Sequence, residues 1–373
     1  MQRAYATRGL RFLPKLTLAI TAGLITAAAS YAVDVFTESV GFVKEQAGTA
    51  ADTVTVVPFT QIDAYRGVVG SVSGNVITDN GSPGWTAGQW MFNPGGGQHN
   101  TYYAIFTSGA NVGAYYIITN NAAGSLSVEL IPTSLGSVSP GDTYRIYPFW
   151  TLNTVWPNGQ GVVASPSTLS KKTEVLFPAI GVNGINQPPS PTYFFLQSAT
   201  ATNWAVVGGI PASSNVNDQI ILPDQYVIVR QQNGASTTTN ITLGQVPSYP
   251  IQTPLYTQAA APQDNFVSVY RPAAQSLAQS GLSNSVVIST QLSHKDLVLV
   301  LSPNGQAANA PANQTYFFVN PTGPSDSGWR LVGSVPSTAD AGSSNVFALG
   351  QGVIVRKVAT NATVVLWNNL PNY

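Results

Sequence analysis

The chain has 373 residues, of which 44% are apolar, 10% aromatic and only 8% charged, and its formal net charge at pH 7 is 0. The many Val, Ile, Tyr and Phe residues favour pleated, half-buried strands, and this apolar content argues against disorder. Because the chain has no cysteine, disulfides, thiol catalysis, cysteine-based zinc sites and iron–sulfur clusters are excluded. We therefore expect an all-β protein that is stabilised by its core area alone.

Residues 1–32 have the pattern of a bacterial-type signal peptide. Four basic residues come first: Arg3, Arg8, Arg11 and Lys15. An apolar stretch at residues 16–29 follows, and Ser30-Tyr31-Ala32 then offers small residues at the cleavage positions. The apolar stretch is shorter than the ~20 residues of a membrane-spanning helix. We predict no transmembrane span after cleavage, with an uncleaved anchor as the alternative.

Cleavage of this segment changes the charge balance. It removes four of the 15 basic residues and no acidic residue, which leaves a net charge near −4. Binding to nucleic acid or to an anionic bilayer is driven by basic surfaces, so neither partner is expected. The predicted location is exported: periplasm, outer surface or extracellular.

Residues 67–148 contain short stretches of alternating or β-branched residues, separated by Gly, Asn and Pro. The stretches are Val68–Ser73, Asn75–Thr78, Thr101–Phe106, Ala114–Thr119, Ser125–Leu130 and Thr143–Tyr147. About six short strands of this kind predict a small closed or nearly closed β-barrel.

The rest of the chain contains an internal sequence repeat. Residues 191–211 and 314–336 both read Thr-Tyr-Phe-Phe, a loop, Trp, Val-Gly and a closing Pro. The matched landmarks keep a nearly constant separation, between 123 and 126 residues: Tyr193 and Tyr316, Trp204 and Trp329, Val227–Arg230 and Val353–Arg356. Residues 52–56 and 264–268 show a weaker similarity. Such a spacing is typical of a duplicated unit.

The predicted fold class is thus all-β, with two duplicated β-sandwich or barrel-like units, the first interrupted by a small inserted barrel. The predicted boundaries are 1–32 for the signal peptide, 33–66 and 149–247 for the first unit, 67–148 for the barrel, 248–263 for a surface linker and 264–373 for the second unit. Only Ala273–Ser280 has a helical pattern.

The repeated aromatic motif favours packing over a ligand site. Alternation buries one or two rings of each Tyr-Phe-Phe run. We expect Trp204 and Trp329 to lie across those rings, each with its indole N–H on a loop carbonyl. Arg230 and Arg356 end their strands, so we expect their charges to point outward at the rim.

No catalytic constellation is found. Asp142 and Asp224 follow Gly and Pro in turns, where Asp usually caps the backbone. His99 and His294 are the only histidines, and no neighbouring carboxylates complete a metal site. Neither Gly-x-Ser-x-Gly nor a phosphate-binding loop occurs. We predict a protein without enzymatic activity, cofactor or metal; a polysaccharide-acting enzyme would need two carboxylates that converge in a groove.

Aromatic residues of the barrel are the candidates for a ligand or partner surface: Trp85, Trp90, Tyr102 and Tyr116. Stacked on one exposed face, they could bind sugar rings. The pairs Tyr102-Tyr103 and Tyr115-Tyr116 are adjacent, however, so one ring of each pair faces the barrel core.

An ordered series of motifs is similar to that of a paralogous family of uncharacterised exported β-rich proteins of Verrucomicrobia-type bacteria. The motifs are Thr37–Phe42, Val57–Thr60, Pro83–Ala87, Trp150–Leu152, Pro223–Arg230 and Gln263–Val267. They span nearly all of the mature chain, although Glu38-Ser39 stands where the family more often has Asp-Pro. The resemblance implies export and a β-rich fold, and it transfers no catalytic residue.

These observations predict an exported, non-enzymatic component of the cell surface, the envelope or the extracellular matrix. It would associate with itself or with an envelope or matrix partner. The alternative is a carbohydrate-binding module that holds a glycan through the barrel aromatics.

Overall fold

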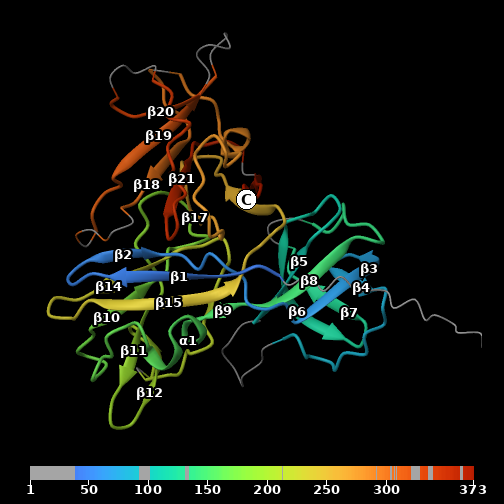
Figure 1. Cartoon of the computed structure of the whole chain (residues 1–373), viewed down its shortest axis with the longest axis horizontal. Coiled ribbons are helices and arrows are strands. Elements are labelled where there is room, and N and C mark those ends of the chain that lie inside the picture. The colour runs from blue at the N-terminus through green and yellow to red at the C-terminus, as the bar shows by residue number, and fades with distance from the viewer. Residues whose placement is uncertain are drawn as a thin grey trace, which may run out of the picture. The chain divides into compact units, whose positions relative to one another are not determined.

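The computed structural model describes residues 38–91, 101–130, 134–211, 213–290, 292–302, 305, 307, 309–320, 328–334, 339–361 and 364–373. The predicted signal peptide, 1–32, lies outside these residues, and so does His99. Nearly all regular secondary structure of the described chain is strand (Figure 1), which confirms the all-β prediction. Within those ranges, no helix has the length and apolar character needed to cross a membrane.

Six strands close into the predicted small barrel. They are β3 (Tyr65–Ser73), β4 (Val76–Asp79), β5 (Tyr102–Phe106), β6 (Tyr115–Ala122), β7 (Ser125–Val128) and β8 (Thr143–Pro148). Their order around the barrel is β3-β4-β7-β6-β5-β8, and Figure 1 shows them grouped together. The first strand begins at Tyr65, two residues before the predicted boundary. Closure leaves no free strand edge in this part of the chain.

A five-stranded antiparallel sheet has one strand before the barrel and four after it. The order is β2 (Asp52–Thr55), β14 (Val227–Gln231), β10 (Thr173–Leu176), β11 (Thr192–Gln197) and β12 (Thr202–Val206). Its buried apolar side chains, among them Val175 and Trp204, pack with those of the short helix α1 (Leu152–Val155). A 3₁₀ turn, η1 (Pro157–Gly159), follows that helix.

A second five-stranded antiparallel sheet comes from residues 263–357. Its order is β17 (Gln263–Ser268), β21 (Gly352–Lys357), β18 (Leu297–Val300), β19 (Gln314–Val319) and β20 (Gly328–Leu331). Val298, Trp329 and Val355 belong to its buried core, and the 3₁₀ turn η2 (Leu282–Ser285) contributes Leu282.

Three two-stranded ribbons complete the described strands. They are β1 (Val40–Ala47) with β15 (Thr238–Gln245), β16 (Ile251–Tyr256) with β22 (Val364–Asn369), and β9 (Trp150–Thr151) with β13 (Ile220–Ile221). The interpretation of 248–263 as a surface linker is wrong for β16, because Ile251 and Leu255 are buried in its pairing with β22.

The helix expected at Ala273–Ser280 is also wrong. This segment forms an isolated bridge between Gln275 and Phe347, followed by a turn. Gln275 is fully buried and its amide donates to the carbonyl of Leu370. Tertiary hydrogen bonds have overridden the local helical pattern.

The repeated aromatic motif packs as predicted, with one difference. Trp204 lies edge-on to Phe195 at a ring distance of 5.6 Å, and Trp329 lies edge-on to Phe318 at 5.3 Å. Both tryptophans are buried, and neither indole N–H has an acceptor among the described residues. The expected bonds to loop carbonyls are therefore not formed, and packing alone holds these rings.

Arg230 and Arg356 do not point freely outward. Arg230 Nε donates to Asp52 Oδ1 at 2.7 Å, and Arg356 Nε donates to Asp264 Oδ1 at 2.7 Å. Each pair joins two neighbouring strands of its own sheet, β14 to β2 and β21 to β17. The prediction of outward charges at the rim did not include the carboxylate that the partner strand supplies across the pairing; both arginine side chains remain partly exposed.

Each of these ion pairs is completed by an asparagine from the opposite half of the chain. Asn309 Oδ1 accepts from Arg230 Nη2 at 2.8 Å, and Asn186 Oδ1 accepts from Arg356 Nη2 at 2.8 Å. Both asparagines have a left-handed backbone, with φ of 60° and 54°. The contacts between the two halves are thus reciprocal.

Candidate functional site

The predicted barrel aromatics lie in the barrel core. Trp85, Trp90 and Tyr116 are 7%, 6% and 0% exposed, and Tyr102 is partly buried against them. Trp90 lies edge-on to Trp85 at 5.9 Å and to Tyr102 at 5.4 Å. Tyr116 lies edge-on to Phe106. These rings are packed in the barrel core, so they do not form the exposed platform that sugar binding would need.

The neighbouring rings, Tyr103 and Tyr115, point out of the barrel, as the alternation predicted. They are nevertheless buried, because they pack against segments that follow the barrel. Tyr103 lies 4.6 Å from Phe149 in ring distance, and Tyr249 belongs to the same cluster. The outward face of the barrel is therefore an internal contact surface.

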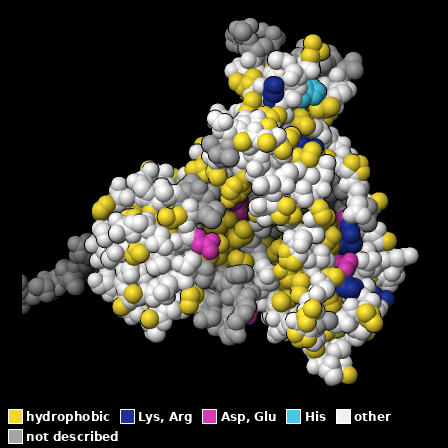
Figure 2. Space-filling model, turned by 180° about the vertical axis from the view of Figure 1, so that it is seen from behind, with side chains coloured by type: hydrophobic (Ala, Val, Ile, Leu, Met, Phe, Trp, Pro, Cys, Tyr) yellow, Lys and Arg dark blue, Asp and Glu magenta, His cyan; other side chains and the backbone are white. Residues whose placement is uncertain are grey.

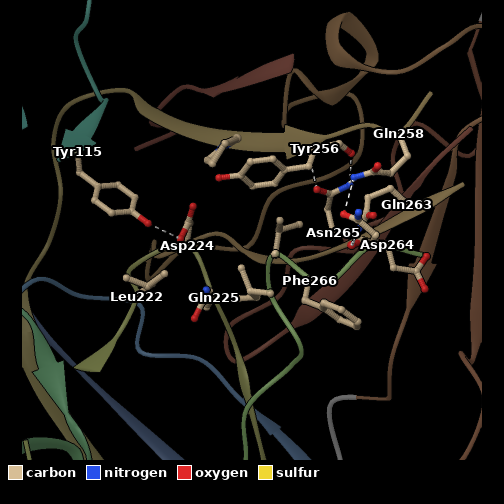
Figure 3. Close-up of a pocket in the computed structure, with 15 residues that line it drawn as sticks. Tyr115, Leu222, Asp224, Gln225, Tyr256, Gln258, Gln263, Asp264, Asn265 and Phe266 are labelled. Carbon is tan, nitrogen blue, oxygen red and sulfur yellow. Dashed lines mark hydrogen bonds between the residues drawn. The ribbon is translucent and has the colours of Figure 1, made fainter. Parts of the chain in front are cut away.

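A cavity of about 320 Å³ lies at this junction. Its wall combines Tyr115 of the barrel, Leu222–Gln225 before β14, Pro254 and Tyr256 of β16, and residues 263–267 of β17. Figure 3 shows the hydroxyl of Tyr115 directed at Asp224, with the Tyr256 ring beside them. The cavity exists only because these separate stretches of the chain meet here, together with Ile180, Gly181 and Asn183.

Asp224 is the distinctive group of the cavity. It is 6% exposed, and its Oδ1 accepts a hydrogen bond of 2.9 Å from the Tyr115 hydroxyl. Burial raises the pKa of this carboxyl from 3.8 to about 6, although the hydrogen bond from Tyr115 and a backbone N–H favour the charged form. A buried acid of this kind in a concave site is a functional candidate.

The opposite wall is polar, and its side chains bond to one another or to the backbone. Gln258 Nε2 donates to Asn183 Oδ1 at 2.7 Å, and Asn265 Nδ2 donates to the Tyr256 carbonyl at 3.0 Å. Gln263 Nε2 donates to the carbonyls of Val182 and Asp264. These hydrogen bonds hold the polar wall in place. The apolar part of the cavity lies on the other side, around Asp224.

Sequence reasoning assigned Asp224 a backbone-capping role and missed its place in the cavity. The carboxyl depends on Tyr115, which is 109 positions earlier in the chain. A Pro-Asp turn gives no sign of such a partner. The burial of Asp224 depends on contacts with segments far away in the sequence, so no local pattern could have identified it.

The other candidate groups do not form a site. His294 stacks on Phe317 at a ring distance of 4.0 Å. Asp142 Oδ2 accepts from the backbone N–H of Ser139 at 2.9 Å, as expected of a turn aspartate. Over the described ranges, no three His, Asp or Glu side chains converge in a way that could hold a metal.

A second feature lies on the ribbon of β1 and β15. Four large apolar side chains on one face are more than 60% exposed: Val40, Phe42, Ile241 and Leu243. Phe42 is paired with Leu243, and Ile241 with Lys44. We call this the apolar ribbon face. Contiguous exposed apolar side chains of this kind mark contact surfaces.

Charged side chains are few and scattered on the face of the molecule shown in Figure 2, where apolar side chains gather in a hollow. No protein-family model, curated protein or solved structure matches the chain. Function therefore has to be inferred from the geometry of the chain itself.

Proposed function

We propose that this chain is an exported, non-enzymatic β-protein that associates with itself at the cell surface, in the envelope or in the extracellular matrix. The apolar ribbon face is the observation that carries this proposal. The signal-peptide pattern of residues 1–32 and the low charge of the chain support the exported location. The burial of Trp85, Trp90 and Tyr116 removes the support for the carbohydrate-binding alternative.

We further propose that the chain is a duplication of one folding unit, 33–66 with 149–247 and then 264–373. The strand orders support this. β2, β14, β10, β11 and β12 follow one another across the first sheet, and their sequence counterparts β17, β21, β18, β19 and β20 follow in the same order across the second. Each half also pairs two strands into a ribbon, β1 with β15 and β16 with β22, although β16 precedes the predicted start of the second unit.

The two ribbons differ in what covers them. Gln252 of β16 donates its backbone N–H to the carbonyl of Gly113 in the barrel at 3.0 Å, and Pro254 and Tyr256 face the cavity beside Tyr115. The barrel therefore packs on the ribbon of the second half. The ribbon of the first half has the apolar ribbon face and no such cover among the described residues.

A second copy of the chain is the occupant that we propose for this face. Two ribbons packed face to face would bury the four apolar side chains of each copy by the same two-fold contact. Lys44 and Gln46 lie at one end of the face and are exposed, so they would form its polar rim. Because association itself costs several kcal/mol, a dimer with a dissociation constant on the order of micromolar is expected.

Replacing Phe42 and Leu243 together by Thr is expected to abolish the dimer, because it removes the two opposed apolar side chains and keeps a residue suited to strands. Sedimentation velocity over a wide concentration range measures this. The matched control replaces Leu169 and Leu292 by Thr; they are 94% and 99% exposed but lie outside the ribbons. A wild-type protein that stays monomeric, or a control that dissociates equally, contradicts the proposal.

The exported location has its own test. When the chain is expressed with residues 1–32 in a Gram-negative host, the mature protein is expected to begin at Val33. Mass spectrometry of the periplasmic and extracellular fractions measures the N-terminus. A full-length chain found only in the cytoplasm contradicts export.

A further inference from the structure

The cavity holds a carboxyl that has no basic partner. None of the ion pairs formed by the described residues includes Asp224. Its side-chain hydrogen bond comes from Tyr115, which is neutral. A buried carboxylate is costly without a compensating positive charge. The contacts of Asp224 within the chain therefore leave its charge uncompensated.

The surroundings of Asp224 suit a positive charge on an apolar stem. The Tyr115 and Tyr256 side chains lie on either side of the carboxyl with their hydroxyl ends toward it (Figure 3), and a hydroxyl oxygen can accept a hydrogen bond from an ammonium group. Leu222, Pro254 and Phe266 supply an apolar wall. The volume of about 320 Å³ matches the lower end of the range for small organic ligands, roughly 300–1,000 Å³.

We propose that this cavity binds a small organic amine, with its ammonium group on the carboxylate of Asp224 and its apolar stem against Leu222, Pro254 and Phe266. The ammonium group donates hydrogen bonds to the carboxylate and to the Tyr256 hydroxyl. This binding site is separate from the apolar ribbon face and does not depend on dimer formation.

Other ligand classes fit the cavity less well. An anion would be repelled by the carboxylate. A sugar presents many hydroxyls, and the polar side chains of the opposite wall, including Gln258 and Asn265, already bond within the protein. A metal ion needs several oxygen ligands, and the nearby Asp264 is engaged with Arg356.

The charge state of Asp224 gives the binding a defined pH dependence. The titratable groups that face it are Tyr115, Tyr256 and Tyr270, and burial raises the pKa of each above the usual 10. They stay neutral below pH 9. The pKa of Asp224 in the free protein is about 6. Amine affinity should therefore level off above pH 7 and fall roughly tenfold by pH 5, where about nine carboxyls in ten are protonated.

The test uses the purified protein and 2-phenylethylamine, with 2-phenylethanol as a neutral probe of the same shape. Isothermal titration calorimetry at pH 7.5 is expected to show at least tenfold tighter binding of the amine. Repeating the titration at pH 5 should give the tenfold loss. Equal affinities for the amine and the alcohol, or no amine binding at millimolar concentrations, overturn the proposal.

Variants separate the binding role of Asp224 from a structural one. Asp224→Asn keeps an oxygen that accepts from Tyr115, so the thermal unfolding midpoint should change little while amine affinity falls at least tenfold. Tyr256→Leu keeps the carboxylate but removes the hydroxyl acceptor, and it should weaken binding severalfold. Asp142→Asn, in a turn outside the cavity, is the matched control and should bind normally. Unchanged amine affinity in Asp224→Asn overturns the proposal.

Discussion

Lys357→Gln is expected to lower the free energy of unfolding by about 3–5 kcal/mol, the range found when one partner of a buried ion pair is removed. Lys357 and Asp296 are 1% and 2% exposed, and their side chains form a direct ion pair. Lys357 Nζ also donates to the carbonyl of Ser285 at 2.7 Å. The substitution leaves the carboxylate of Asp296 buried without a counter-charge.

The first half of the chain contains a buried pair of side chains that is neutral. Thr173 and Gln231 are paired on β10 and β14. In the duplication that we propose, they correspond to Asp296, which directly precedes β18, and to Lys357 of β21. Thr173 Oγ1 donates to Gln231 Oε1 at 2.7 Å, and both residues are buried. A neutral hydrogen bond thus takes the place of the ion pair.

The double variant Asp296→Thr with Lys357→Gln transfers this neutral pair to the second half. Replacing a buried ion pair by well-packed hydrophobic residues is often neutral, and a Thr–Gln hydrogen bond likewise leaves no buried charge. The double variant should therefore recover part of the stability that Lys357→Gln loses, while the backbone N–H groups of Val287 and Val358 lose the carboxylate as acceptor. Chemical denaturation measures both, with the exposed Lys295→Gln as control. A double variant no more stable than the single one would show that the two sites are not interchangeable.

Glu45→Gln is expected to stabilise the protein at pH 8 by on the order of 2 kcal/mol and to have little effect near pH 4.5. Glu45 lies on the inner side of β1, where burial raises the pKa of its carboxyl from 4.5 to about 8. Hydrogen bonds from the Val56 N–H, at 3.4 Å, and from Thr55 compensate only in part.

The direction of this pH dependence follows from which state, folded or unfolded, binds the Glu45 proton. Between pH 4.5 and 8 the folded protein keeps the Glu45 proton, and the unfolded chain has lost it. The stability contribution is therefore fully present below pH 4.5 and is lost as the pH rises through about 8. Glutamine is neutral throughout and keeps its stability.

Thermal unfolding of wild type and Glu45→Gln across this pH range measures the effect. The difference in unfolding midpoint should grow with pH in favour of the variant. Glu129→Gln, at an exposed position next to β7 of the barrel, is the matched control for the loss of one carboxylate. A Glu45→Gln variant that is less stable than wild type at pH 8 would mean that the carboxylate is held charged.

Much of the fold could be predicted because its signals are local. Six short alternating stretches with Gly, Asn and Pro between them are enough to indicate the barrel, since strand alternation and turn chemistry operate over a few residues. The alternation correctly predicted that one ring of the Tyr115-Tyr116 pair lies inside the barrel and the other outside, but the residue chosen as a surface candidate, Tyr116, is the inner one.

The errors occurred where distant segments decide the outcome. β16 contains Pro254, which weakens the strand pattern, and its pairing partner β22 begins more than 100 residues later. Gln275 sits in a helical pattern but bonds to Leu370 and pairs with Phe347. In both places a contact with a distant segment outweighs the local structural preference, and the neighbouring residues give no sign of that contact.

The sequence by itself determined the all-β class, the barrel and the aromatic packing of the two similar halves, because composition, alternation and turn residues act locally. Only the tertiary structure decided which groups lack partners: the apolar ribbon face, and the carboxyl of Asp224 beside Tyr115. Burial and pairing depend on segments far apart in the chain. The surfaces proposed to bind a second copy and an amine therefore emerge only when the strands are assembled.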